Sequence, residues 1–155
     1  MQRRAPPQAV ELVARIREAI RDAAGSVLAG LYLFGSLVAG DFDVDVSDVD
    51  LIAVLTSDPS DDLVARLGRM HDALASENPV WAGRIEVVYV STAALSRWWE
   101  GIARLAVISP GEPFHVVEGG PDCGCSRAGS AIVTLCPRRR TRSSPCVVVV
   151  HAVRG

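Results

Sequence analysis

The pattern of hydrophobic and polar positions predicts two long amphipathic helices and a short third one. Between residues 9 and 24, apolar residues recur every three or four positions, so they line one face of a helix. The same spacing returns over residues 62–76, directly after Ser60 and Asp61, which are both good capping residues. A shorter helix is expected over residues 92–99, which end in a Trp-Trp pair.

Short apolar runs predict the strands of a small sheet. The runs 31–34, 49–55 and 84–90 are bounded by turn or polar residues, and 49–55 is apolar enough to be a central strand. An edge strand could follow at 115–117, after a turn at 111–113. Strands that alternate with helices in a chain of 155 residues predict one α/β (α+β) domain, with a small mixed sheet and flanking helices.

The distribution of charge divides the chain near Asp122. The net charge is only −2, but all 18 acidic residues lie at or before Asp122. Residues 123–155 contain arginines and all four cysteines, and they show no helical periodicity. We therefore predict a folded domain over residues 1–122 and an irregular tail over residues 123–155.

Several functional classes are not favoured by this composition. The cysteine spacing in the tail is unlike that of zinc knuckles, and the arginines at 138–140 have no aromatic neighbour that could stack on bases. No run approaches the roughly 20 apolar residues of a membrane helix, and no signal sequence follows the first residues. We expect a cytoplasmic protein that binds neither a membrane nor nucleic acid.

Paired aspartates at the start of the run 49–55 indicate a metal site. Alternate residues of a strand point to the same face, so Asp48 and Asp50 project side by side. Two adjacent negative charges are unfavourable unless a cation compensates them, and Mg²⁺ typically binds one or two carboxylates together with substrate phosphates. Asp41, Asp43 and Asp45 form a second acidic run, which we interpret as a solvated loop because no apolar strand begins directly behind it.

Gly35 and Ser36 are candidates for binding phosphate, because they form a turn after the strand 31–34. Glycine lets the backbone approach a ligand closely, and a serine hydroxyl can donate to phosphate oxygens. Backbone N–H groups would add to this if a helix begins at Leu37. Gly40 then allows the chain to turn into the loop that leads to the aspartates.

Glu86 is an acidic residue inside an otherwise apolar strand, where a charge needs a partner or a metal. If this strand lies beside 49–55, Glu86 could complete the metal site or take a proton from a hydroxyl group. The alternative is a structural ion pair with an arginine such as Arg84 or Arg104. Trp98-Trp99 could form a platform for a sugar, but packing in the core is the simpler interpretation.

The run LYLFGSLVAGDFDVDVSDVDLIAVL resembles the nucleotidyltransferase signature of the DNA polymerase β superfamily, with a strand, Gly-Ser, a loop and Asp-x-Asp. The segments YLFGSLVAGDF, SDVDL and RIEVVYV are most similar to bacterial aminoglycoside nucleotidyltransferases of the streptomycin/spectinomycin adenylyltransferase type. The resemblance covers roughly residues 8–122 and implies a polymerase-β-like fold. It implies that Gly35 and Ser36 bind nucleotide phosphates, that Asp48 and Asp50 bind two Mg²⁺ ions, and that Glu86 is the general base.

By this resemblance, the expected reaction transfers AMP from ATP, the co-substrate, to a hydroxyl of an aminoglycoside-type small molecule. Two alternatives stay open: a minimal nucleotidyltransferase that modifies a protein or an RNA, as in a toxin–antitoxin pair, and a nucleotide-binding protein without turnover. Adenylyltransferases of this kind carry a helical C-terminal domain, which 123–155 do not resemble. We interpret that tail as an out-of-frame translation, which would impair activity.

Overall fold

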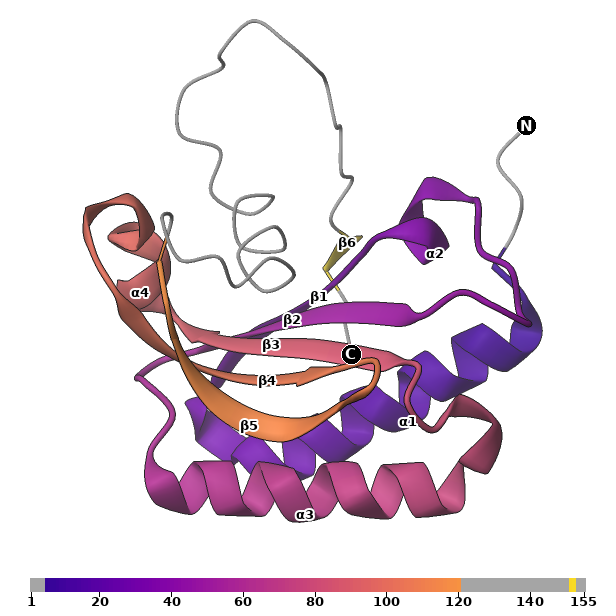
Figure 1. Ribbon diagram of the computed structural model, residues 1–155, viewed down its shortest axis with the longest axis horizontal. Helices are drawn as coiled ribbons and strands as arrows, with labels where there is room; N and C mark the ends of the chain where they lie inside the picture. The colour runs from indigo at the N-terminus through magenta and orange to yellow at the C-terminus, as the bar shows by residue number, and fades with distance from the viewer. Residues whose placement is uncertain (1–4, 121–150, 153–155) are drawn as a thin grey trace, which may run out of the picture.

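Two long helices, α1 (Pro7–Ala24) and α3 (Asp61–Glu77), cover one face of a six-stranded sheet in the computed structural model (Figure 1). The structure describes residues 5–120 and 151–152. The strands are β1 (Leu28–Phe34), β2 (Val49–Leu55), β3 (Ile85–Ser91), β4 (Ala103–Ser109), β5 (Glu112–Gly119) and β6 (His151–Ala152). The shorter helices are α2 (Ser36–Ala39) and α4 (Thr92–Ser96), and 3₁₀ turns span Gly25–Val27, Pro79–Trp81 and Trp98–Glu100.

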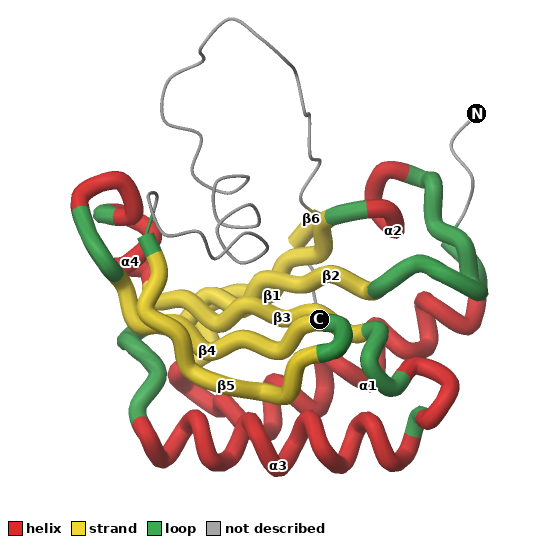
Figure 2. The backbone as a smooth tube through the Cα atoms, viewed as in Figure 1, coloured by secondary structure: helices red, strands yellow, loops and turns green. Residues whose placement is uncertain are grey.

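The sheet is mixed, and its strands follow the order β5-β4-β3-β2-β1-β6. Only β2 and β3 run parallel among the paired strands of the described chain, and α3 forms the crossover between them. The short helices α2 and α4 lie near opposite ends of the other face (Figures 1 and 2). This arrangement confirms the predicted fold class, a small mixed sheet with flanking helices.

Local signals set the ends of the two long helices. Pro7 occupies the first turn of α1, where a missing N–H is harmless, and Gly25 ends the helix with a φ of 58°. The hydroxyl of Ser60 accepts a hydrogen bond from the N–H of Leu63 at 3.2 Å and so caps α3. Both helices therefore begin and end within two residues of the predicted bounds.

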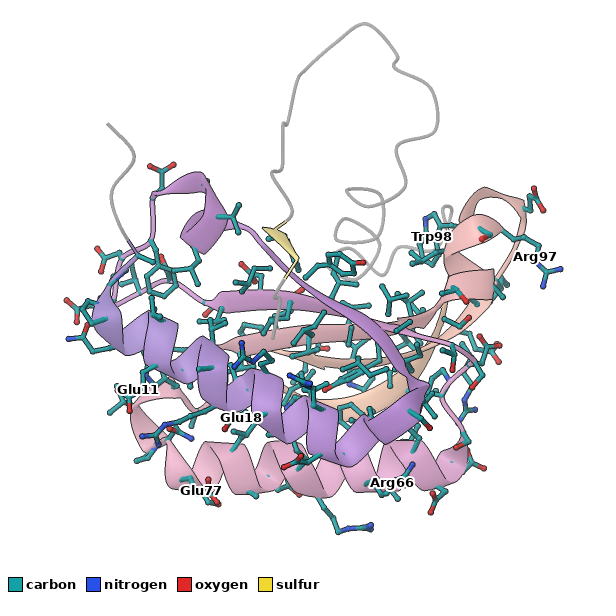
Figure 3. The ribbon with its side chains drawn as sticks, turned by 180° about the vertical axis from the view of Figure 1, so that it is seen from behind. Glu11, Glu18, Arg66, Glu77, Arg97 and Trp98 are labelled. Carbon is teal, nitrogen blue, oxygen red and sulfur yellow. The ribbon has the colours of Figure 1, made fainter. Side chains whose placement is uncertain are left out.

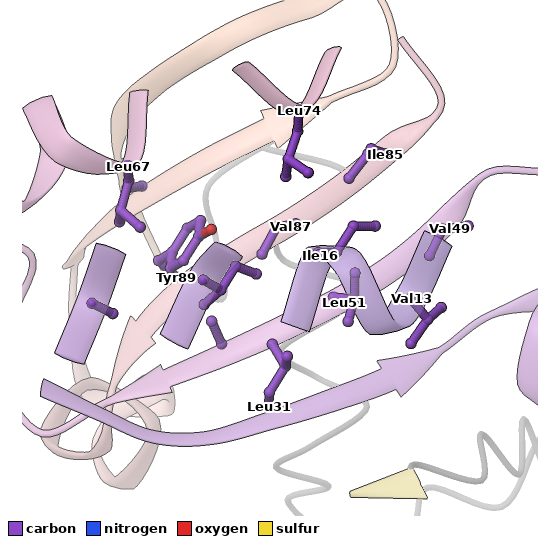
Figure 4. Close-up of a cluster of buried hydrophobic side chains, with 14 of the residues drawn as sticks. Val13, Ile16, Leu31, Val49, Leu51, Leu67, Leu74, Ile85, Val87 and Tyr89 are labelled. Carbon is purple, nitrogen blue, oxygen red and sulfur yellow. The ribbon is translucent and has the colours of Figure 1, made fainter. Parts of the chain in front are cut away.

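The main core fills the space between these helices and the sheet. Ile16 of α1 and Leu67 of α3 meet Leu51 and Val87 of the two central strands, and all four are fully buried (Figure 4). Residues on the opposite face of the same strands form a second cluster, which includes Ile52 and Val88 together with Val90, Trp98 and Leu105. Burial on both faces explains why β2 and β3 are apolar almost throughout.

A buried polar pair joins α3 to the sheet. Nε2 of His71 lies 2.8 Å from the hydroxyl of Tyr89, and the ring of Phe114 stacks on His71 with centroids 5.4 Å apart. Burial lowers the pKa of His71 from 6.5 to about 4 and raises the pKa of Tyr89 well above its ordinary value. The imidazole is therefore neutral at pH 7, and the pair holds α3 and β3 in a fixed alignment.

The segment 92–109 differs from the prediction. The short helix α4 ends at Ser96, a 3₁₀ turn follows, and β4 then forms a strand for which no prediction was made. Trp98 is 1% exposed and packs in the second core cluster, whereas the neighbouring Arg97 points outward (Figure 3). Core packing is thus confirmed as the role of Trp98.

Little of the predicted tail belongs to the described structure. Ala152 and His151 pair with Tyr32 and Leu33 of β1, which makes β6 the outer strand on that side. The four cysteines and the arginines at 138–140 lie outside the described residues, so the predictions made for them stay predictions. Across residues 5–120 and 151–152, no helix has the length and apolar character needed to cross a bilayer.

Candidate active site

Asp50 and Glu86 are neighbours on the face of the sheet opposite α1 and α3. The parallel register of β2 and β3 pairs Asp50 with Glu86 directly, and on the other side Asp50 pairs with Phe34 of β1. Since Leu51 and Val87 point into the helix-covered core, the residues before them point to the opposite face. The structure therefore brings together two acidic residues that are far apart in the sequence.

Gly35 contacts the carboxylate of Asp50 so closely that only glycine fits. A Cβ atom at this position would overlap with Oδ2 of Asp50 and would lie 3.1 Å from its Cγ. Gly35 also has a φ of 73° and a ψ of −153°, a conformation that is essentially restricted to glycine. The Gly-Ser turn and the Asp-x-Asp motif are thus in direct contact.

Ser36 begins α2, one residue earlier than the predicted start at Leu37. The carbonyl of Gly35 accepts a hydrogen bond from the N–H of Ala39 at 3.0 Å, which fixes the turn that presents Ser36. Gly40 ends this short helix in the left-handed conformation, with a φ of 85°. The predicted phosphate-binding residues therefore lie on a defined turn next to Asp50.

The acidic loop between α2 and β2 folds on itself. The carboxylate of Asp43 accepts a hydrogen bond from the N–H of Asp45, and the hydroxyl of Ser47 accepts one from the N–H of Asp43, both at 2.9 Å. Asp41, Asp43 and Asp45 are exposed. These contacts agree with the interpretation of this run as a solvated loop.

Asp48 immediately precedes β2 and is half-buried, whereas Glu86 is buried, with 4% of its surface exposed. Arg84, which was considered a partner for Glu86, donates from Nη2 to the carbonyl of Ser47 at 2.5 Å. Arg104 donates to the carbonyl of Pro59 and pairs with the carboxylate of Asp61 at 2.6 Å.

The contact between Arg84 and the loop was missed by sequence reasoning. The only signal for it in the sequence is a basic residue two positions before Glu86, at the start of an apolar strand. That signal does not reveal which backbone carbonyl the guanidinium reaches.

The carboxylates of Asp48 and Asp50 suit a magnesium ion that takes its remaining ligands from a nucleotide and water. Within the described ranges, no three His, Cys, Asp or Glu side chains are placed so that they could hold a metal by themselves. Mg²⁺ in nucleotide sites typically takes one or two carboxylates and completes its shell with phosphate oxygens and water. Asp48 and Asp50 provide such hard oxygen donors and are only partly buried, beside the turn at Gly35.

A cavity of about 380 Å³ lies near the C-terminal ends of β2 and β3, whereas Asp50 and Glu86 lie near their N-terminal ends. Asp58, Arg97 and Glu100 are among the residues that line the cavity. None of the residues predicted to bind phosphate, metal or a proton lines this cavity. The acidic pair and the cavity are therefore separate features of the molecule.

Comparison with known families gives a match to the one described as nucleotidyltransferase domain, over residues 13–92. This range includes every predicted site residue, from Gly35 to Glu86. A comparison with curated proteins gave no match.

Two solved structures are similar to the chain. The spectinomycin adenyltransferase AAD(9) from Enterococcus faecialis, solved with ATP and spectinomycin, has 15% sequence identity and a TM-score of 0.54. The match covers 71% of this chain and 48% of that chain, so the likeness shows a shared fold over about half of that enzyme. A protein from Sulfolobus solfataricus, described as a candidate nucleotidyltransferase, has 19% identity and a TM-score of 0.35, with 58% and 81% of the two chains covered.

Proposed function

The chain belongs to the nucleotidyltransferase domain family, and on this premise we propose that it transfers AMP from ATP to a hydroxyl of an aminoglycoside-type small molecule, with Mg²⁺ as the cofactor. The observation that carries the proposal is the direct contact between Gly35 and Asp50, together with the register that sets Glu86 beside Asp50. The residues proposed for phosphate binding, metal binding and proton transfer thereby lie close together, at the N-terminal ends of β2 and β3.

The nucleotide would be held by the turn and by the aspartates. The hydroxyl of Ser36 can donate to phosphate oxygens, and Gly35 lets the turn that presents Ser36 lie against the carboxylate of Asp50. Asp48 and Asp50 would hold Mg²⁺, which supplies positive charge against the phosphates when it is bound. Two carboxylates without a cation would instead repel a triphosphate, so we expect nucleotide binding to depend on magnesium.

Glu86 would take the proton from the attacking hydroxyl. The hydroxyl oxygen then forms a bond to the α-phosphorus of ATP, while the bond from that phosphorus to the bridging oxygen breaks. Pyrophosphate leaves with the electron pair of the broken bond, and the proton passes from Glu86 to solvent. This role follows from the place of Glu86 beside Asp50 and from the need for a carboxylate within reach of the reacting hydroxyl.

The acceptor class is supported by the shared fold with a spectinomycin adenyltransferase and by the charge of the site. Asp48, Asp50 and Glu86 lie near one edge, with the exposed Asp41 and Asp45 in the adjoining loop. A group of carboxylates attracts a cationic acceptor, and aminoglycosides carry several amines.

The experiment is an adenylylation assay with the purified chain, Mg²⁺-ATP and either spectinomycin or streptomycin. We expect the antibiotic to gain one AMP, detected by mass spectrometry, and Asp50→Asn to abolish the product. Asp72→Asn is the matched control, because it removes the same charge from an exposed position on α3, which covers the other face of the sheet.

Full activity in Asp50→Asn would refute the assignment of the metal site. If the wild-type chain transferred AMP to a protein or an RNA and to neither antibiotic, the proposed acceptor would be wrong and the minimal nucleotidyltransferase would take its place. If it bound Mg²⁺-ATP and transferred to no acceptor, the interpretation without turnover would replace it.

A further inference from the structure

Arg84 holds the backbone on both sides of Asp48, and we propose that it is a positioning residue for the binding of Mg²⁺-ATP. Nη2 of Arg84 donates to the carbonyl of Ser47 at 2.5 Å, and the carbonyl of Arg84 accepts from the N–H of Val49 at 2.9 Å. These two hydrogen bonds bracket Asp48. The inference rests on the proposed function, because it assigns to Arg84 an effect on the site that Asp48 and Asp50 form.

The hydrogen bond to Ser47 acts on Asp48 through the peptide bond. The carbonyl of Ser47 belongs to the peptide unit that ends at the nitrogen of Asp48, so fixing this carbonyl fixes the orientation of that planar unit. The bond from Val49 fixes the next peptide unit in the same way. Asp48 lies outside the regular strand, so these contacts provide the alignment that the sheet itself gives to Asp50.

Arg84 is itself held in place by Trp81. Its Cζ atom lies 4.6 Å from the centroid of the Trp81 ring, and its backbone N–H donates to the backbone carbonyl of Trp81 at 3.0 Å. Trp81 is 8% exposed and its ring lies 6.2 Å from that of Phe42, at the start of the same loop. The loop is therefore attached to the 79–84 segment at both ends, by Phe42 and by Ser47.

An arginine suits this position better than a lysine. The guanidinium is planar, so it can stack on Trp81 and donate in its own plane to the Ser47 carbonyl at the same time. A lysine keeps the positive charge but loses the stacking and the fixed direction of the donor.

The test is to measure how Mg²⁺-ATP binds to wild type, Arg84→Met and Arg84→Lys by isothermal titration calorimetry over a series of Mg²⁺ concentrations. Partners that orient metal ligands typically change metal affinity about 10- to 100-fold when they are removed. We expect a loss of that size in Arg84→Met, with a higher Mg²⁺ concentration needed for half-saturation, and a smaller loss in Arg84→Lys. Arg66→Met is the control, because Arg66 lies on α3 and forms an ion pair with its helix neighbour Asp62 at 3.6 Å.

Failure of this inference and failure of the proposed function give different results. If Arg84→Met binds Mg²⁺-ATP as wild type does, while Asp50→Asn does not bind, Arg84 has no positioning role and the proposed function stands. If wild type shows no Mg²⁺-dependent binding of ATP, the proposed function itself fails. Should Arg84→Met show no cooperative thermal unfolding, Arg84→Lys decides, and an unchanged Mg²⁺ dependence in that variant refutes the inference.

Discussion

The contact between Gly35 and Asp50 predicts that Gly35→Ala disables the site beyond its effect on stability. The new methyl group would occupy the place of Oδ2 of Asp50, so the carboxylate would have to move away. The backbone conformation at Gly35, with a φ of 73°, adds strain of about 1–3 kcal/mol for any other residue. In a chain of this size each kcal/mol lowers the melting temperature by about 2–4 °C, so a loss of several degrees is expected.

Gly111→Ala separates the strain from the displacement of Asp50. Gly111 has a similar φ of 79°, but a Cβ atom there would meet nothing within 4 Å. Gly111→Ala should therefore lose only the stability that the positive φ costs, and Gly35→Ala should lose at least as much, both measured by thermal unfolding. Only Gly35→Ala should also lose the stabilisation by Mg²⁺-ATP. That stabilisation is about 2.7 kcal/mol for a ligand at 100 times its Kd. An unchanged Mg²⁺-ATP shift in Gly35→Ala would show that the position of Asp50 does not control nucleotide binding.

Two further predictions concern titratable residues. Glu86→Gln keeps the size of the side chain but cannot take a proton, so we expect kcat to fall about 10²- to 10⁴-fold while calorimetry still detects Mg²⁺-ATP binding; an unchanged kcat would exclude Glu86 as the base. Because the pKa of His71 is about 4 in the folded state and 6.5 in the unfolded state, the unfolded chain binds more protons between these values, and about 3 kcal/mol of stability should be lost as the pH falls from 6.5 through 4. His71→Gln should remove this part of the acid sensitivity in urea unfolding, and an unaltered acid loss in that variant would contradict the reasoning.

The elements that the sequence predicted best are those with local signals. The bounds of β2 follow from a run that is apolar except for Asp50, and the start of α3 follows from a capping serine. The strand β4 was missed because Arg104 interrupts its apolar residues and the single Gly101 is a weak signal for the end of the segment before it. Its place in the sheet depends on pairing with β3 and β5, which is a long-range property.

The same distinction applies to the candidate site. The residue types at Gly35, Asp48 and Asp50 could be selected from the sequence, because spacing along one short segment is a local property. Two contacts could not be inferred in this way. One is the overlap that a side chain at Gly35 would make with Asp50, and the other is the hydrogen bond from Arg84 to Ser47. Both depend on how the loop of residues 41–48 returns to the sheet.

The register between β2 and β3 links the candidate site to the core. The two strands pair residue by residue from Val49 opposite Ile85 onward, so Asp50 lies beside Glu86. Continuing this register backward by one residue places Arg84 beside Asp48, which agrees with the hydrogen bond from Val49 to Arg84. A slip of one residue would turn one strand's side chains to the opposite face and would separate these pairs.

The contacts that prevent such a slip lie on the helix-covered face. Tyr89 of β3 is fully buried there, and its hydroxyl contacts His71 of α3 at 2.8 Å. The helix α3 connects β2 to β3 in the chain. The contact between His71 and Tyr89 therefore holds α3 at a fixed position along β3. Alternate residues of β3 point to the helix-covered core and to the face that carries Glu86. A change at His71 or Tyr89 can therefore move β3, and with it Glu86, relative to Asp50 without altering either carboxylate.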